Sequence, residues 1–304
     1  GNSQNLVFEI AQDAVTLISP GETDLSSVLP GSPEQNERII FITDTLTQRQ
    51  CSTCLEQNIV SVDILQNAIL KLYGPQAGGL VISSRLSSYS FTDLENYLNE
   101  KEDTEQFADD LMLADWVVIS FLKLQSDQPS STTLKRLLTE QTSLLRDKKV
   151  VAFSFNAPYY LDATDISKLT AYYGFYSKAP QFFDVAARIL FEESIPNGAL
   201  PVSVPGIGYD LISATSPNSD QIIHLYLSKV AQASTTQVPS ATQTPTGVSE
   251  EETIYRVGDV LSIRTSEILD TNNHQVPDGT VVRFIMASQS SLEGTISTQI
   301  DTTT

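Results

Sequence analysis

The sequence predicts an α/β fold: a three-layer α/β/α sandwich with a mostly parallel sheet, followed by a small antiparallel β module. Up to residue 231, short apolar runs alternate with segments of helical period, which is typical of βα units and a parallel sheet. Several runs are apolar at both odd and even positions, as strands covered by helices on both faces must be. After residue 249 the apolar period changes to two, which indicates half-buried strands.

Four apolar runs are the predicted strands of the sheet. They are residues 38–44 (RIIFITD), 80–84 (LVISS), 116–122 (WVVISFL) and 149–155 (KVVAFSF). Each is short, rich in β-branched and aromatic residues, and separated from the next by enough chain for a crossover helix.

The segments around these runs each carry one apolar helical face. Ser61 can cap the second helix, which Gly74 ends, Ser130 or Ser131 can begin the third, and Pro180 begins the fourth. The predicted inward faces are Leu6, Ile10, Ala14 and Leu17 in the first helix, Leu65, Ile69 and Leu72 in the second, Leu134, Leu137, Leu138 and Leu145 in the third, and Phe182, Phe183, Ala186, Ile189 and Leu190 in the fourth.

An uncharged connector separates two predicted domains. Residues 232–249 read QASTTQVPSATQTPTGVS, a composition too poor in bulk to offset its ordering entropy, and proline keeps it extended. We therefore expect an α/β domain at residues 1–231, a linker at 232–249 and a β module at 250–304. The module holds turn residues such as Asn272, Asn273 and Gly279, but it is short against the roughly 100 residues of a complete sandwich.

Composition excludes several classes of partner. The chain carries 18 Lys and Arg against 37 Asp and Glu, a net charge of -19, which argues against nucleic acid. No apolar run is long enough to insert into a membrane. Two cysteines and two histidines do not complete a zinc site, and we expect neither metal nor cofactor. The chain begins with Gly1 and lacks a signal-peptide pattern, so we expect a mature or trimmed piece of a larger precursor.

A block at residues 148–205 carries a family resemblance. It reads KKVVAFSFNAPYYLD, then AYYGFY, then PQFFDVAARILFEESIPNGALPVSVP, and it resembles the C-terminal α/β domain of glycoside hydrolase family 3. The opening stretch at residues 10–19 (IAQDAVTLIS) is similar to the helix with which that domain begins, and the Leu29-Pro30 pair to the Leu-Pro that leads the strand after it, so the likeness spans nearly all of residues 1–228. The carrying motifs are Asn156-Ala157-Pro158-Tyr159, the aromatic run from Ala171 to Tyr176, the helix from Ala186 to Phe191, and Pro196-Asn197-Gly198-Ala199-Leu200-Pro201-Val202.

The resemblance implies that catalysis belongs to a neighbour. In this family a separate N-terminal β/α barrel supplies the nucleophilic Asp and, in the hexosaminidase branch, a His. The two histidines here, His224 and His274, do not lie in the barrel's Lys-His-Phe-Pro-Gly-His segment, so no catalytic residue is carried over. The Asp-Arg-x-x-Leu and Pro-x-x-Gln pattern of glucosidase relatives is missing, which favours the β-N-acetylhexosaminidase branch. The implied partners are that barrel of the same polypeptide and a carbohydrate, in an extracellular or cell-surface setting.

The β module has a resemblance of its own. Val257-Gly258-Asp259, Leu269-Asp270 and the stretch at 276–284 (VPDGTVVRF) are similar to bacterial Ig-like repeats of the invasin type. Turn chemistry alone demands several of the same residues.

The turn after the last predicted strand holds the candidate substrate-binding residues, Asn156, Tyr159, Tyr160 and Asp162. Open α/β sheets place ligands at the carboxyl ends of their strands, so Asp162 and Asp165 are the candidates for the two carboxyl groups that a retaining glycosidase needs. A helix cap is the alternative role for these acids. The aromatic residues that could stack on sugar or fill the core are Tyr159, Tyr160, Tyr172, Tyr173 and Tyr176.

Cys51 and Cys54 form a C-S-T-C pair, which reads as a local disulfide, as two inert thiols or as a thioredoxin-like redox site. The tyrosines, the Ig-like resemblance and the cysteine pair leave two other functions open. One is a non-enzymatic carbohydrate-binding or adhesion module, and the other is a thiol oxidoreductase.

Overall fold

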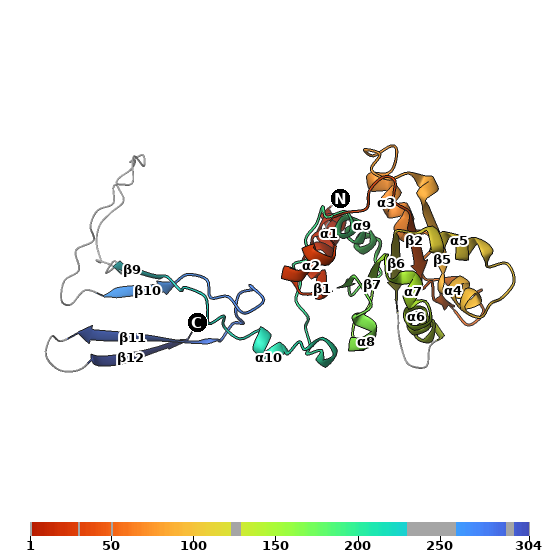
Figure 1. Cartoon of the computed structure of the whole chain (residues 1–304). Helices are drawn as coiled ribbons and strands as arrows, with labels where there is room; N and C mark the ends of the chain where they lie inside the picture. The colour runs from red at the N-terminus through yellow and green to blue at the C-terminus, as the bar shows by residue number, and fades with distance from the viewer. Residues whose placement is uncertain are drawn as a thin grey trace, which may run out of the picture. The chain divides into compact units, whose positions relative to one another are not determined.

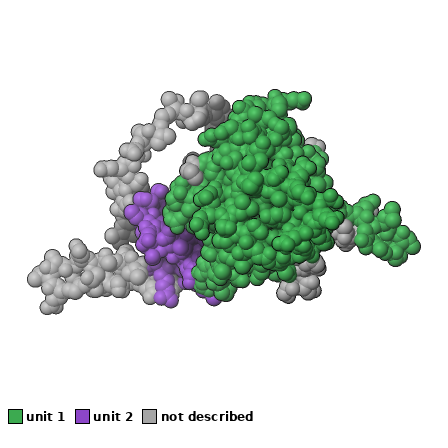
Figure 2. Space-filling view, turned by 45° about the vertical axis from the view of Figure 1, so that its right-hand side comes forward, with its two compact units in different colours: residues 1–211 green, residues 212–304 purple. Residues whose placement is uncertain are grey.

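The computed structural model describes residues 2–29, 31–49, 51–122, 129–229, 260–289 and 295–303. These residues belong to two units, Gly1–Leu211 and Ile212–Thr304, which Figure 2 colours green and purple. The predicted linker at 232–249 lies outside the described residues, as do Val257, Gly258 and Asp259 of the Ig-like resemblance.

A six-stranded sheet with the order β1-β8-β7-β6-β2-β5 forms the centre of the first unit (Figure 1). Five strands are parallel, and β1 pairs antiparallel with β8 at one edge. The parallel strands alone run 2-1-3-4-5 in chain order, which is the flavodoxin-like order of doubly wound sheets. The strands are β1 (Thr16–Ser19), β2 (Ile39–Thr43), β5 (Leu86–Ser90), β6 (Trp116–Phe121), β7 (Lys149–Ser154) and β8 (Ala171–Gly174).

Helices cover both faces of this sheet, as predicted. Helices α1 (Asn2–Ala14), α3 (Ile64–Tyr73) and α9 (Pro180–Leu190) pack on one face. Helices α4 (Phe91–Leu98), α5 (Glu105–Leu113) and α6 (Pro129–Glu140) pack on the other. Alternate side chains of β6 enter the two apolar clusters and are fully buried, which explains a strand that is apolar at every position.

Three of the four predicted strands are confirmed as β2, β6 and β7, but the strand at 80–84 is wrong. Leu80 and Ile82 are 53% and 40% exposed, and residues Ser83–Arg85 form a 3-10 turn. The real strand, β5, follows it and has the polar sequence LSSYS. It pairs only with β2, at the edge of the sheet, where burial is incomplete and apolar patterning is weak.

The first helix also differs from its prediction. Leu6 and Ile10 are 56% and 51% exposed, while Ala11 is buried against the core. The reason is that the helix ends at Ala14, so Leu17 belongs to β1 and does not continue a helical stripe. The third predicted helix divides at Gln141 into α6 and α7 (Thr142–Leu145), with all four predicted leucines buried.

The helices α3 and α9 agree with their predicted faces, although the residue preceding α3 is Asp63, not Ser61, and Leu72 is only partly buried. The other short elements of the chain's first 214 residues are α2 (Glu22–Val28), β3 (Thr47–Gln48), β4 (Gln57–Asn58), η1 (Ser83–Arg85), α8 (Ala163–Ile166), η2 (Pro205–Ile207) and α10 (Leu211–Ala214).

The second unit contains antiparallel ribbons, as its period of two predicts. β9 (Leu225–Lys229) pairs with β10 (Leu261–Thr265), and β11 (Val281–Gln289) pairs with β12 (Thr295–Thr303). The predicted α/β domain extends to residue 231, whereas the first unit ends at Leu211. The difference arises because β9 finds its partner strand beyond the predicted linker. An Ig-like fold for this unit stays a prediction.

Candidate functional site

A cavity of about 370 Å³ lies at the carboxyl edge of the sheet, and we call it the carboxyl-edge cavity. Its walls come from segments that follow β2, β6, β7 and β8, together with the segment that precedes α3. Doubly wound sheets bind their ligands at this edge, near the point where strand order reverses, which here lies between β2 and β6. The lining residues are Leu46, Ile59, Leu122, Phe155, Asn156, Tyr176, Ser177 and Lys178.

Two buried hydroxyl groups lie near the carboxyl ends of β2 and β6, outside the lining of this cavity. Thr43 and Ser120 are neighbours in the β2–β6 register and are 1% and 3% exposed. Neither side-chain oxygen has a hydrogen-bond partner among the described residues. Ser120 shares a sheet face with Leu122, because two residues along a strand return to the same side. An unpaired buried hydroxyl costs on the order of 1–3 kcal/mol, so these two residues lower the free energy of unfolding of the domain.

The backbone around the cavity is strained at two bulky residues. Leu46 and Tyr176 have φ values of 37° and 60°, in the left-handed region that non-glycine residues avoid. Each such conformation costs about 1–3 kcal/mol and persists only where the surroundings enforce it, typically at functional sites. Tyr176 is held by a hydrogen bond from its hydroxyl to Thr16 Oγ1 at 3.0 Å.

The rim of the cavity is polar. Lys178 supplies the one charge in the lining as the structure describes it, and Asn156 and Ser177 add hydrogen-bonding groups. Ser177 Oγ accepts a hydrogen bond from the backbone N–H of Ala179 at 3.3 Å. Ala179 is the N-cap of α9, and no side chain caps this helix terminus. The partial positive charge of the helix N-terminus therefore adds to that of Lys178.

Of the four predicted substrate-binding residues, only Asn156 lines this cavity. Tyr159 packs against the opposite apolar cluster, where burial raises the pKa of its hydroxyl. Tyr160 is 42% exposed. The four residues therefore do not converge on one site, since they follow a turn that passes from one sheet face to the other.

Asp162 has a structural role in α8. Its Oδ1 accepts a hydrogen bond from the backbone N–H of Asp165 at 3.0 Å, which makes it the N-cap. Its Oδ2 lies 3.3 Å from Lys135 Nζ, which lies equally close to Asp165 Oδ2. The hydrogen bond from Asp165 N–H and the contacts with Lys135 lower the pKa of Asp162. The structure therefore matches the helix-cap alternative for these two acids, and both carboxylates form ion pairs with Lys135.

The tyrosines divide between core and surface. Tyr172 and Tyr173 are 0% and 3% exposed, so the option that they stack on sugar is wrong. The Tyr172 hydroxyl donates to the backbone carbonyl of Pro158 at 3.0 Å, which fastens the Asn-Ala-Pro-Tyr turn to β8. This hydrogen bond and the burial of the ring explain why position 172 is a tyrosine, without a role in sugar binding.

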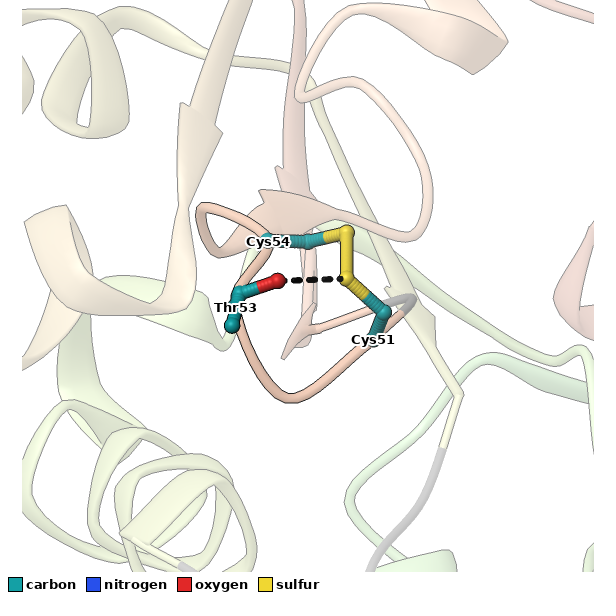
Figure 3. Close-up of a disulfide and its surroundings, with 3 residues drawn as sticks. All are labelled: Cys51, Thr53 and Cys54. Carbon is teal, nitrogen blue, oxygen red and sulfur yellow. Dashed lines mark hydrogen bonds between the residues drawn. A yellow bond between two sulfur atoms is a disulfide. The ribbon is translucent and has the colours of Figure 1, made fainter.

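Cys51 and Cys54 form a disulfide at the tip of the β3–β4 hairpin (Figure 3). Both residues are exposed, and Cys51 Sγ lies 3.5 Å from Thr53 Oγ1. The pair precedes a hairpin strand and not a helix N-terminus, which is where redox-active thiols have a lowered pKa. The same hairpin carries Leu46 and Ile59 into the cavity wall, and the Ile59 N–H donates to the Leu46 carbonyl at 2.8 Å.

A larger cavity, of about 740 Å³, lies at the opposite, amino edge of the sheet. Several basic side chains line this cavity, but two of them already form hydrogen bonds or ion pairs within the domain. Lys148 Nζ donates to the backbone carbonyls of Met112 and Ala114, and Lys149 Nζ pairs with Glu37 at 2.6 Å. These lysines fasten α5 and β7 to the sheet, so the carboxyl-edge cavity is the better candidate site.

Within the described ranges, no group of three or more His, Cys, Asp or Glu side chains is placed to hold a metal ion. None of the helices in the same ranges has the length and apolar character needed to cross a membrane.

Gly198, from the Pro-x-Gly-x-Leu-Pro-Val motif, lies where a later segment meets the start of the sheet. Its backbone N–H donates to the Val15 carbonyl at 2.8 Å. A Cβ at this position would lie 2.4 Å from the Ala14 carbonyl oxygen and 2.8 Å from Thr16 Oγ1. Only glycine fits, because the neighbouring atoms are mostly backbone that cannot move aside.

Fold and cavity together define a class of protein: a doubly wound α/β domain with a small cavity at the carboxyl edge of its sheet. No protein-family model and no curated protein matches the chain.

Solved structures of glycosidases are similar to it at low identity. One is a fungal multi-domain glycoside hydrolase family 3 β-N-acetylglucosaminidase, with 17% identity and a TM-score of 0.45 over 76% of this chain and 21% of that one. A family 3 β-N-acetylglucosaminidase from Paenibacillus sp. has 12% identity and a TM-score of 0.45 over 67% and 33% of the two chains. β-Glucosidase 3B from Thermotoga neapolitana has 14% identity and a TM-score of 0.43 over 72% and 33%. The chain thus spans a fifth to a third of these proteins.

Proposed function

We propose that this chain is the accessory α/β portion of an exported glycoside hydrolase of family 3, and that it supports a separate barrel domain. The barrel would hydrolyse β-N-acetylhexosaminides or related β-glycosides. The observation that carries this proposal is the motif block at residues 148–205, which resembles the family's C-terminal domain over a strand, a turn, a second strand, a helix and a final glycine motif.

The position of this block in the fold supports a structural role for it. Its parts are β7, the turn that Tyr172 fastens, β8, α9 and the segment that returns to β1 through Gly198. These elements are contiguous in the sheet order β1-β8-β7. The motif residues therefore build one edge of the domain and hold its N-terminal strand in place.

An extracellular or cell-surface location belongs to the same proposal. An exposed disulfide persists in oxidising compartments and is rare in the cytosol. The Thr- and Pro-rich composition of residues 232–249 supports a spacer between the domain and an Ig-like module.

Enzyme assays on two proteins test the proposal. The chain alone should release no nitrophenol from an aryl N-acetylglucosaminide, whereas the product of the complete reading frame that contains it should release nitrophenol. Robust release by the chain alone that is abolished by Asp162→Ala would defeat the accessory role. An open reading frame without a barrel, combined with glycan-array binding that Tyr159→Ala abolishes, would favour the adhesion alternative.

A further inference from the structure

We propose that the carboxyl-edge cavity binds a small organic anion, a molecule with a ring-sized apolar body and one carboxylate or phosphate group. This inference concerns the described residues of the first unit and does not depend on the proposed glycosidase partner.

The apolar body follows from the walls. Leu46, Ile59, Leu122 and Phe155 belong to or pack against the apolar cluster on one sheet face, and they line the cavity together. A volume of about 370 Å³ is at the lower end of the range for small-molecule sites, which bury most of their ligand against apolar walls. The cavity therefore has room for a single ring with a short substituent.

The acidic group follows from the rim. Lys178 contributes a cation in a chain whose net charge is -19, and the ion pairs of the described lysines use Lys71, Lys135 and Lys149 instead. The N-terminus of α9, eleven residues long, follows Lys178 directly and has no side-chain cap; because Pro180 has no N–H and Phe182 N–H donates to the Ala179 carbonyl, it contributes its dipole and not a row of free donors. A helix N-terminus and an adjacent lysine both favour a bound anion.

The position of the cavity is independent of the rim and indicates a site instead of a packing gap, because the cavity lies at the carboxyl edge of the sheet, where strand order reverses between β2 and β6. The buried hydroxyls of Thr43 and Ser120, which lack partners among the described residues, lie near the same ends of β2 and β6 but do not line the cavity. Leu46 and Tyr176, which are far apart in the sequence, both line the cavity and both have left-handed backbone conformations. Both features lower stability, and a functional site is one of the reasons for which native proteins keep them.

Isothermal titration of the full chain at low salt tests the inference with three probes: benzoate, phenyl phosphate and the neutral isostere benzamide. At least one of the two anions should bind saturably, and about tenfold or more tightly than benzamide, the factor expected of a hydrogen bond to a charged group. Lys178→Ala should weaken anion binding by about the same factor, while Lys178→Arg should retain it. Lys101→Ala is the matched control, because Lys101 is an exposed lysine outside the lining and should leave binding unchanged.

Near-ultraviolet circular dichroism would establish that each variant is folded. Equal binding of benzamide and both anions would overturn the inference, as would unchanged anion binding by folded Lys178→Ala. The absence of saturable binding of either anion up to about 10 mM, weaker than any useful site, would also overturn it. A preference for phenyl phosphate or for benzoate would identify which acidic group the rim selects.

Discussion

Gly198→Ala should destabilise the first unit strongly, although it adds only one methyl group. The added Cβ would lie 2.4 Å from the Ala14 carbonyl oxygen, 2.8 Å from its carbonyl carbon and 2.8 Å from Thr16 Oγ1. The backbone must move apart to relieve these contacts, and overpacking of this kind costs about 1–3 kcal/mol. The movement also disrupts the hydrogen bond from Gly198 N–H to the Val15 carbonyl, worth about 0.5–1.5 kcal/mol. The expected total is about 2–4 kcal/mol.

Thermal unfolding followed by the fluorescence of Trp116, the single tryptophan and fully buried, measures this effect. A unit of this size loses about 2–4 °C in Tm per kcal/mol, so Tm should fall by about 4–16 °C. Gly206→Ala is the matched control, since its Cβ would make ordinary contacts at 3.7 Å or more. Equal Tm values for the two variants would refute the close approach at Gly198, and with it the structural explanation of the glycine motif.

Three further predictions concern individual contacts. Asp162→Ala removes the N-cap of α8 and should cost about 1 kcal/mol in chemical denaturation, whereas a loss near zero would contradict the capping role. Burial alone would raise the pKa of Glu37, but hydrogen bonds from Lys149, Glu34 N–H and Trp116 lower it overall. Its stabilising effect is therefore complete above about pH 4.3 and lost as the pH falls through the lowered value, so Glu37→Gln should show a shallower acid limb of stability against pH than the parent chain. Cys51→Ser should lower stability by at most about 2 kcal/mol, because the disulfide closes a four-residue loop, and reductant should not destabilise this variant further. Insulin reduction by the parent chain that Cys51→Ser abolishes would instead support the redox alternative.

Apolar patterning predicted the central strands well and the edge strand badly. β6 is buried at all six positions, and such a strand needs an unbroken apolar sequence that stands out from its flanks. β5 contacts one neighbouring strand and carries serines at three of five positions, so the more apolar stretch before it, at 80–84, gives the stronger strand signal. The predicted inward face of α1 is wrong for a related reason. Helical period continues through residue 17 in the sequence, but pairing of β1 with β8 ends the helix at Ala14.

The candidate site could be predicted only in part. Asn156 follows a predicted strand, which is the sequence signal for a site residue in an open α/β sheet, and it lines the carboxyl-edge cavity. Leu46, Ile59, Leu122 and Lys178 carry no local signal of function, since each is an ordinary residue in its own segment. Asp44, the acidic end of the predicted strand RIIFITD, lies outside the lining of the cavity. It is 3% exposed and accepts a hydrogen bond from Leu122 N–H at 3.3 Å, linking the ends of β2 and β6.

By itself, the sequence determined the layered α/β architecture, the antiparallel character of the strands after the uncharged connector, and the family-like block at residues 148–205. These features depend on period and composition, which short stretches of chain carry on their own. Tertiary structure alone decided the strand order, the limit of the first unit at Leu211, and the meeting of five segments around one cavity. The physical reason is that pairing and cavity formation depend on contacts between residues far apart in the chain, and these leave no periodic trace in either segment.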